Sequence, residues 1–193
     1  MVSEDSFTLS ALRRHGLKAT VLAAKPEEWE LDGLGCVIVG GDAFSFGKRP
    51  PRRPSAYDMA RLLSFVEAGG LVVCFQLNDT DWPAVWGTER LEVVEPESRG
   101  ASIAEPGHWL LAGVGSLAGQ RCYDRIESAS PGWRVLARDD RGRPCGLSLR
   151  RGAGELVVFL PNVDRVYAEP QAMSMSVADC ARILENVVRR CAR

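Results

Sequence analysis

Few side chains in this sequence could perform covalent chemistry. Cys74 could act as a nucleophile with His108 as its base, and Asp79 with Asp164 could support a carboxylate-based reaction. Cys74 follows three apolar residues, however, and burial raises the pKa of a thiol. We therefore expect Cys74 to be a packed strand residue and His108 to complete a turn. A hydrolase or transferase that uses either pair is the alternative.

Polar residues that follow predicted strands form a second group. Ligands of open α/β sheets bind at the carboxyl ends of the strands, so polar side chains there are candidates for binding. The residues expected at this place are Asp42, Gln76, Asn78, Asp79, Asn162 and Asp164. We expect them to bind a partner protein or a small polar or sugar-like ligand. Around Asn78–Trp82 a helix cap is an equal alternative, because Pro83 suits the first turn of a helix.

Metal, cofactor and nucleic-acid sites are not expected. The six cysteines are scattered without the spacing of a zinc site, and we expect most of them to be reduced packing residues. Gly40-Gly41-Asp42 lacks the glycine spacing of a dinucleotide or phosphate loop. The basic segment Lys48–Arg53 has no interleaved aromatic residues, which favours a solvated loop over a nucleic-acid site.

The elements that must position these residues follow from the apolar periodicity. Helical segments have apolar residues three and four positions apart, whereas buried strands are short apolar runs. The first half predicts a helix over Ser3–His15, strands at Thr20–Ala24, Cys36–Val39 and Leu71–Phe75, and a helix that begins at Ser55 with Asp58 in a capping box. Strand, helix and strand in this order predict an α/β fold with a mainly parallel sheet.

The second half of the chain has a weaker pattern at first and a clear one later. From Asn78 to Gly132 we expect only short strands or turns, and the tryptophans there could fill a core or line a groove for a partner: Trp82, Trp86 and Trp109. A hairpin is predicted over Trp133–Ala137 and Gly146–Leu149, followed by a core strand at Leu156–Leu160. The last helix is predicted to be capped by Ser176 and to bury the stripe Cys180, Ile183, Leu184, Val187, Val188 and Cys191.

The order of the segments GLKATVL, LGCVIVGG, LLSFVEAGGLVVCF, PGHWLLAGV and GWRVLARDDRGRPCGLSLRRGAGELVVFLPN resembles the class I glutamine amidotransferase-like superfamily. Within it, the chain looks like the ThuA-like proteins and the domains attached to bacterial glycosidases. The resemblance covers Ser6 to Asn162. It implies a flavodoxin-like three-layer sandwich with a mainly parallel sheet, followed by a C-terminal β-hairpin and helix.

In catalytic members of this superfamily, a sharp turn after a strand presents a cysteine, and a histidine follows the last strand. The resemblance places Gln76 at the nucleophile position, with Cys74 and Asn78 where small residues are expected. It places Pro161–Asp164 where the histidine should lie. A glutamine cannot attack a carbonyl. The resemblance therefore implies a domain without catalytic activity.

The resemblance also implies a strand ahead of the first helix, whereas only Met1 and Val2 precede Ser3. The sheet could lack this strand, the start of the reading frame could be misplaced, or another chain could supply the strand. In the last case a protein partner or a homo-oligomer is expected, because an unfilled slot leaves strand edges unpaired.

Bulk properties limit the remaining possibilities. The 193 residues, of which 46% are hydrophobic, predict one domain over 1–193. A net charge of -1 creates no overall attraction to nucleic acid or to a membrane. No apolar run reaches the roughly 18 residues needed to cross a bilayer, and the acidic start does not resemble a signal peptide. We therefore expect a cytoplasmic protein.

Overall fold

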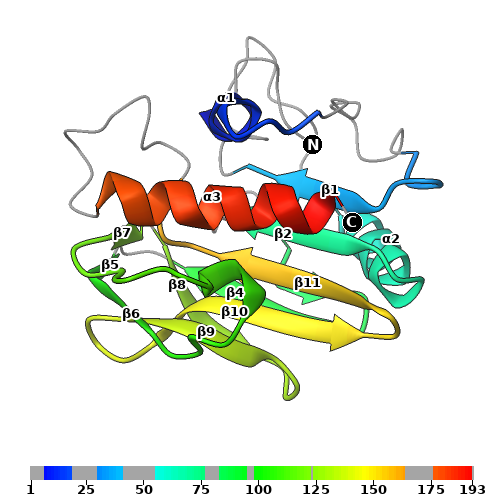
Figure 1. The fold of residues 1–193 in the computed structure, drawn as a ribbon. Helices are drawn as coiled ribbons and strands as arrows, with labels where there is room; N and C mark the ends of the chain where they lie inside the picture. The colour runs from blue at the N-terminus through cyan, green and yellow to red at the C-terminus, as the bar shows by residue number, and fades with distance from the viewer. Residues whose placement is uncertain are drawn as a thin grey trace, which may run out of the picture.

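The computed structural model describes residues 7–18, 30–40, 55–76, 83–94, 98–122, 124–163 and 176–192. A six-stranded sheet forms its centre, and helix α3 runs across the sheet in Figure 1. Several predicted features lie outside the described residues: the start of the first helix at Ser3, the strand at Thr20–Ala24, the segment Lys48–Arg53 and the segment Asn78–Trp82.

The central sheet is mixed. Its strands lie in the order β1-β2-β11-β10-β9-β6 and comprise Cys36–Val39 (β1), Leu71–Phe75 (β2), Gly154–Phe159 (β11), Pro144–Arg151 (β10), Arg134–Asp139 (β9) and Ala101–Ile103 (β6). β2 pairs in parallel with β1 and β11, and the other three neighbouring pairs are antiparallel. The prediction of a mainly parallel sheet was wrong for these strands, because two successive hairpins, β9–β10 and β10–β11, extend the sheet by reversing the chain.

Helix α2 (Ala56–Glu67) begins as the sequence predicts. The Asp58 amide donates to Ser55 Oγ (3.3 Å), and the Ser55 amide donates to the Asp58 carboxylate (2.8 Å). This capping box satisfies donors that the first turn of a helix leaves free. The apolar residues on the inner face are buried: Met59, Leu62, Leu63 and Val66. The helix ends at Glu67, and Ala68 and Gly69-Gly70 lead directly into β2.

Helices cover both faces of the sheet at β11. Adjacent residues of a strand point to opposite faces. A Cβ atom at Gly154 would collide with the Val66 carbonyl of α2, whereas the Glu155 side chain accepts a hydrogen bond from Trp109 in the short helix η2 (Trp109–Leu111). Thus α2 packs on one face and η2 on the other. Helix α3 (Val177–Cys191) lies on the η2 side, because Asn186 donates to carbonyls of the η2 segment.

Helix α3 buries most of its predicted stripe. Cys180, Ile183, Leu184 and Val187 are fully buried, whereas Val188 and Cys191 are half-buried. Ser176 stands at the N-cap position, but its side chain makes no capping hydrogen bond, so that part of the prediction was wrong.

Helix α1 (Phe7–Arg14) ends at Gly16, whose φ is +87°. A glycine adopts this left-handed conformation without steric cost, and it therefore stops the helix directly after the predicted range Ser3–His15. Of the helices that the structure describes, none is long and apolar enough to span a membrane.

Short strands fill the region where the sequence pattern is weak. They are β3 (Val85–Trp86), β4 (Glu89–Val94), β5 (Ser98–Arg99), β7 (Arg121–Cys122) and β8 (Arg125–Ala129). Trp86 is completely buried, and its indole N–H donates to the Pro83 carbonyl (2.8 Å). Trp86 is therefore a core residue rather than part of a groove for a partner.

The six cysteines all lie in described parts of the chain. Cys74, Cys122, Cys145 and Cys180 are buried cysteines outside the disulfide. Cys36 and Cys191 form a disulfide across a sequence separation of 155 residues. The sequence predicts reduced packing residues for most cysteines, and this holds for four of the six.

Candidate functional site

Gln76 occupies an unusual backbone conformation directly after β2. Its φ is +49°, and among the described residues it is the only non-glycine with a positive φ. Left-handed backbone costs a side chain with a Cβ roughly 1–2 kcal/mol, and such strain is concentrated at functional sites. The Gln76 amide donates to the Phe159 carbonyl at the end of β11 (3.0 Å), which fixes the turn to the neighbouring strand. The sharp turn thus lies at the position that the resemblance implies.

The structure brings two of the predicted ligand-binding residues together. Gln76 Nε2 donates to Asn162 Oδ1 at 2.7 Å, although the residues are 86 positions apart. Asn162 is only 3% exposed, and its backbone N–H donates to the Arg121 carbonyl (3.0 Å). Since β2 and β11 are parallel neighbours, their carboxyl ends meet here, as the sequence analysis expects.

Gln120 is a third member of this site, and the sequence analysis did not identify it. Its side chain is fully buried, and its Nε2 donates to the Asn162 carbonyl. Its Oε1 is buried and has no hydrogen-bond partner among the described residues. Gln120 follows no predicted strand, so no sequence pattern could have placed it beside Asn162. We call Gln76, Gln120 and Asn162 the amide cluster.

The amide cluster suits binding better than covalent chemistry. Side-chain amides carry no charge, and each offers both donors and acceptors of hydrogen bonds. They are neither nucleophiles nor bases at neutral pH. A buried acceptor that no described residue satisfies, such as Gln120 Oε1, costs about 1–3 kcal/mol until a donor reaches it. The other predicted members of this set lie outside the described residues: Asp42, Asn78, Asp79 and Asp164.

Cys74 lies two residues before Gln76, inside β2. It is completely buried, and this burial raises the pKa of its thiol to about 12. A thiolate, which is the nucleophilic form, is therefore scarce at neutral pH. This environment matches the expectation of a packed strand residue.

His108 lies beside the amino end of β11, whereas the amide cluster lies at the carboxyl end. Its Nε2 is 2.8 Å from Glu155 Oε1, and its Nδ1 accepts a hydrogen bond from the Leu110 amide (3.3 Å). Because Nδ1 accepts, the ring proton is on Nε2 and is donated to Glu155. Glu155 pairs with Leu71 in the sheet, and Leu71 precedes Cys74 by three residues of β2. His108, which contacts Glu155, and Cys74 are therefore separated by roughly 10 Å along the strand direction. This geometry gives no support to a Cys74–His108 pair.

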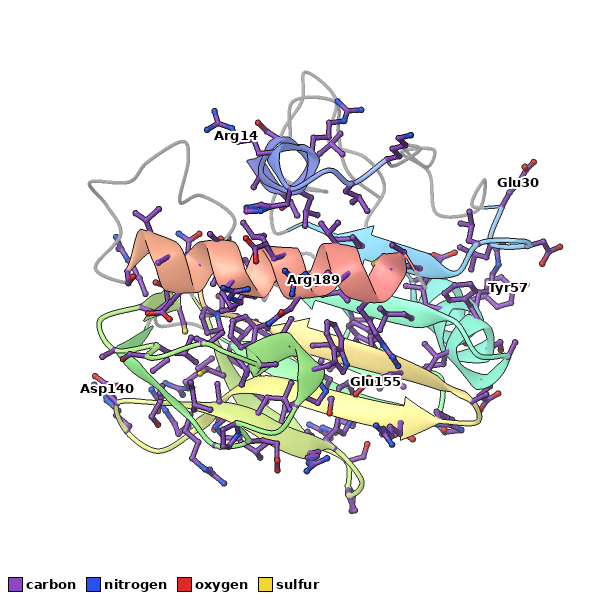
Figure 2. All side chains as sticks on the ribbon, viewed as in Figure 1. Arg14, Glu30, Tyr57, Asp140, Glu155 and Arg189 are labelled. Atoms are coloured by element: carbon purple, nitrogen blue, oxygen red, sulfur yellow. A yellow bond between two sulfur atoms is a disulfide. The ribbon has the colours of Figure 1, made fainter. Side chains whose placement is uncertain are left out.

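Glu155, which is labelled in Figure 2, is a buried carboxylate. Burial would raise its pKa, but hydrogen bonds from His108 and Trp109 (2.7 Å to Oε2) hold the pKa below its ordinary value. Arg190 on α3 lies over the Trp109 ring, 5.9 Å from its centre. Each Glu155 oxygen has a partner, so this group anchors η2 to the sheet. His108 thus completes a turn, as expected, and its Nε2–H donates to the buried Glu155 carboxylate.

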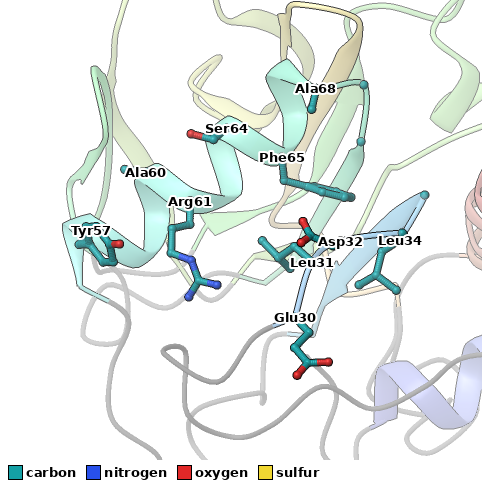
Figure 3. Close-up of a pocket in the computed structure, with 14 residues that line it drawn as sticks. Glu30, Leu31, Asp32, Leu34, Tyr57, Ala60, Arg61, Ser64, Phe65 and Ala68 are labelled. Carbon is teal, nitrogen blue, oxygen red and sulfur yellow. The ribbon is translucent and has the colours of Figure 1, made fainter.

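A ligand could also bind through a metal ion or in a cavity elsewhere in the fold. Within the described ranges, no group of three or more His, Cys, Asp or Glu side chains could hold a metal ion. A cavity of about 1260 Å³ lies between α2 and the segment 30–35 (Figure 3). Its wall includes Glu30, Asp32, Tyr57, Arg61 and Phe65. The cavity borders the start of β1 and therefore lies away from the amide cluster.

Comparison with known proteins identifies the fold but no family. No protein-family model matches the chain, and no curated protein sequence matches it. Solved structures similar in fold include a putative GMP synthase protein from Thermoplasma acidophilum (TM-score 0.61, 12% identity, 95% of this chain and 85% of that one). A cytoplasmic protein of Salmonella typhimurium gives a TM-score of 0.60 at 14% identity, with 95% and 85% of the two chains covered.

A longer chain contains the same fold. An exo-β-1,4-mannosidase from an Opitutaceae bacterium matches with a TM-score of 0.56 and 14% identity. The match covers 94% of this chain, but this chain spans only 30% of the length of the mannosidase. At these identities the similarity shows the fold alone. This chain has an α/β fold shared with the putative GMP synthase protein and with a segment of the mannosidase.

Proposed function

We propose that this chain is a non-catalytic, flavodoxin-like domain of the glutamine amidotransferase-like type, and that it binds a small polar ligand at the amide cluster. One observation supports the proposal most directly. The strained turn after β2 presents Gln76. Gln76 is hydrogen-bonded to Asn162, which follows β11, the last of the three parallel strands. In catalytic relatives these two places hold a cysteine and a histidine. Here two amides occupy them.

The chemistry of the amide cluster favours an uncharged ligand with hydroxyl or amide groups. Gln120 Oε1 needs a donor, and Gln76, which is half-buried, has both donor and acceptor atoms at the turn. A sugar or the carboxamide of an amino acid would supply such groups. The fold also occurs in a mannosidase, which acts on a sugar, and in a putative GMP synthase protein.

Binding is tested by titrating the isotope-labelled chain with mannose, galactose and L-glutamine while the side-chain amide signals are recorded by NMR. We expect one of these probes to shift the signals of Gln76, Gln120 and Asn162, and the Gln76→Ala variant to weaken that binding at least about tenfold, the equivalent of about 1.4 kcal/mol. Asn186→Ala is the matched control, since Asn186 binds carbonyls near η2 instead. Equal binding by both variants, or no shift with any probe, would contradict the proposal.

The lack of catalysis is tested by thiol labelling of Cys74 at different pH values, with Cys74→Ser as control. Because burial raises the pKa of Cys74 to about 12, we expect labelling only on unfolding. Fast labelling of the native protein with a midpoint near neutral pH would restore the cysteine-dependent hydrolase or transferase.

A partner protein is the second candidate, since the fold forms part of a longer chain in the mannosidase. Homo-oligomerisation is its simplest form. Light scattering at increasing protein concentration measures homo-oligomerisation. A mass that stays at the monomer value would exclude it, and a different partner protein or the small ligand would remain as candidates.

A further inference from the structure

The Cys36–Cys191 disulfide joins two separate parts of the fold. Cys36 opens β1 directly after Gly35, which lines the cavity, and Cys191 is the last residue of α3. Their Cα atoms are 5.5 Å apart, which is an ordinary separation for a disulfide. The link therefore connects the end of α3 to the wall of the cavity.

These two cysteines also differ from the other four in burial. Cys36 and Cys191 are half-buried, whereas the remaining cysteines are at most 1% exposed: Cys74, Cys122, Cys145 and Cys180. Thiol–disulfide exchange requires that an external thiolate or disulfide reach the sulfur atoms. Of the six cysteines, only this pair is partly exposed to solvent.

Non-covalent contacts hold the two linked segments unequally. The centre of α3 is anchored by four buried side chains, but its last turn is half-buried at Val188 and exposed at Arg189 and Arg190. The segment 30–35 is attached to the sheet by a hydrogen bond from the Leu71 amide to the Gly35 carbonyl (3.0 Å). Breaking the disulfide therefore removes the covalent tie between the last turn of α3 and the cavity wall, while the buried side chains keep α3 docked.

We propose that Cys36 and Cys191 form a reversible redox-modification site that controls the cavity wall at residues 30–35. Oxidation uses a small disulfide such as glutathione disulfide. One cysteine thiolate attacks it, forms a mixed disulfide and releases one glutathione; the second cysteine thiolate then displaces the other glutathione. The two cysteines lose two electrons, the glutathione disulfide gains them, and the two protons end on the released thiols. Two glutathione molecules reverse the process.

The size of the closed loop predicts a large effect on stability. A cross-link limits the unfolded chain more strongly as the loop lengthens, and 155 residues separate this pair. Reduction is expected to lower the Tm on the order of 10 °C. Hydrogen exchange should rise at residues 30–36 and 188–192 several-fold more than the rise that the lower global stability causes in β2 and β11.

The test equilibrates the full chain with different ratios of reduced and oxidised glutathione, then alkylates and digests it for mass spectrometry. We expect the linked Cys36–Cys191 peptide to increase with oxidised glutathione and to disappear on reversal. Hydrogen exchange and Tm are measured in both states of the unmodified sequence, so no variant has to fold. Free alkylation of both cysteines at every ratio would overturn the proposal, and so would equal exchange at residues 30–36 in the linked and reduced states.

Variants separate this pair from the other thiols. Cys36→Ser, Cys191→Ser and the double variant should have the same Tm under oxidising conditions, because each removes the same bond. Cys180→Ser, on the same helix, should keep the response to glutathione. A response that survives in Cys191→Ser, or additive losses in the double variant, would contradict the assignment.

Discussion

Strand β11 has a buried polar group near each of its ends, and the two groups differ in charge and in completeness. At the amino end, each oxygen of the charged Glu155 has a partner, His108 or Trp109. At the carboxyl end the amide cluster is neutral, and Gln120 Oε1 has no partner among the described residues. Buried polar groups are costly unless they are satisfied. The complete group therefore belongs to the architecture, and the incomplete one is the candidate for binding.

The largest expected effect comes from breaking the complete group. Glu155→Ala leaves the His108 and Trp109 N–H groups without an acceptor and should lower the free energy of unfolding by about 3–5 kcal/mol. Urea denaturation measures the loss. The matched control is Glu127→Ala, because that carboxylate is half exposed and its surface pair with Arg125 contributes about 1 kcal/mol at most. Similar losses in both variants would remove the difference between the two ends of β11.

A pH series distinguishes a charged group from a neutral one. The pKa of Glu155 is lower in the folded protein than its ordinary value of about 4.3, so its stabilising contribution is complete above that pH and is lost as pH falls through the folded pKa. The loss is about 1.4 kcal/mol for each unit of difference between the two pKa values.

The Glu155→Gln variant isolates this contribution. Burial would raise the pKa of Asp139, but hydrogen bonds from Arg143 hold it low, and this acid-sensitive contribution is present in both proteins. We expect stability measured below about pH 4.3 to fall more steeply in the parent than in Glu155→Gln. Parallel pH curves would show that Glu155 is not the charged anchor described here.

A smaller effect is expected at Gln120. Gln120→Met removes the hydrogen bond to the Asn162 carbonyl, but it also removes the buried unpaired Oε1. The two changes oppose each other, and the net change in unfolding free energy should be a gain or loss of at most about 1 kcal/mol. A loss above about 2 kcal/mol in urea denaturation would mean that Oε1 has a partner in solution, and the amide cluster would then be as complete as the Glu155 group.

The smallest change in stability is expected at Gln76. Gln76→Gly removes the hydrogen bond to Asn162 but relieves the left-handed backbone, so the free energy of unfolding should change by about 0.5 kcal/mol or less. Ligand binding, measured by the same NMR titration, should be lost. A stable variant that still binds would place the ligand elsewhere.

Local patterns in the sequence predict most of the fold. The capping box at Ser55 and Asp58, the apolar stripe of α3 and the runs that form β2 and β11 depend on neighbouring residues, and these elements formed as expected. The balance of parallel and antiparallel pairs was wrong because strand direction depends on the connections, and the tight turn at Gly152-Ala153 reverses the chain between β10 and β11. The disulfide joins residues 155 positions apart, which no local pattern reveals.

The candidate site was predictable only in part, for a similar reason. Gln76 and Asn162 each follow a strand, and the rule for parallel sheets therefore brought them together correctly. Gln120 enters from a segment without periodicity, and its contact with Asn162 depends on how the region after η2 packs. His108 could not be assigned a partner in advance, since the sequence around Glu155 is equally typical of an exposed residue at the start of a strand.

The central position of β2 has a consequence for synthesis on the ribosome. β2 pairs on one side with β1, which emerges earlier, but its other neighbour is β11, which begins only at Gly154 and pairs with β2 from Glu155↔Leu71 to Phe159↔Phe75. Until that segment emerges, one side of an apolar strand has no hydrogen-bonding partner. The nascent chain therefore carries an aggregation-prone strand edge through much of its translation, and completion of the sheet is a late step rather than a gradual one.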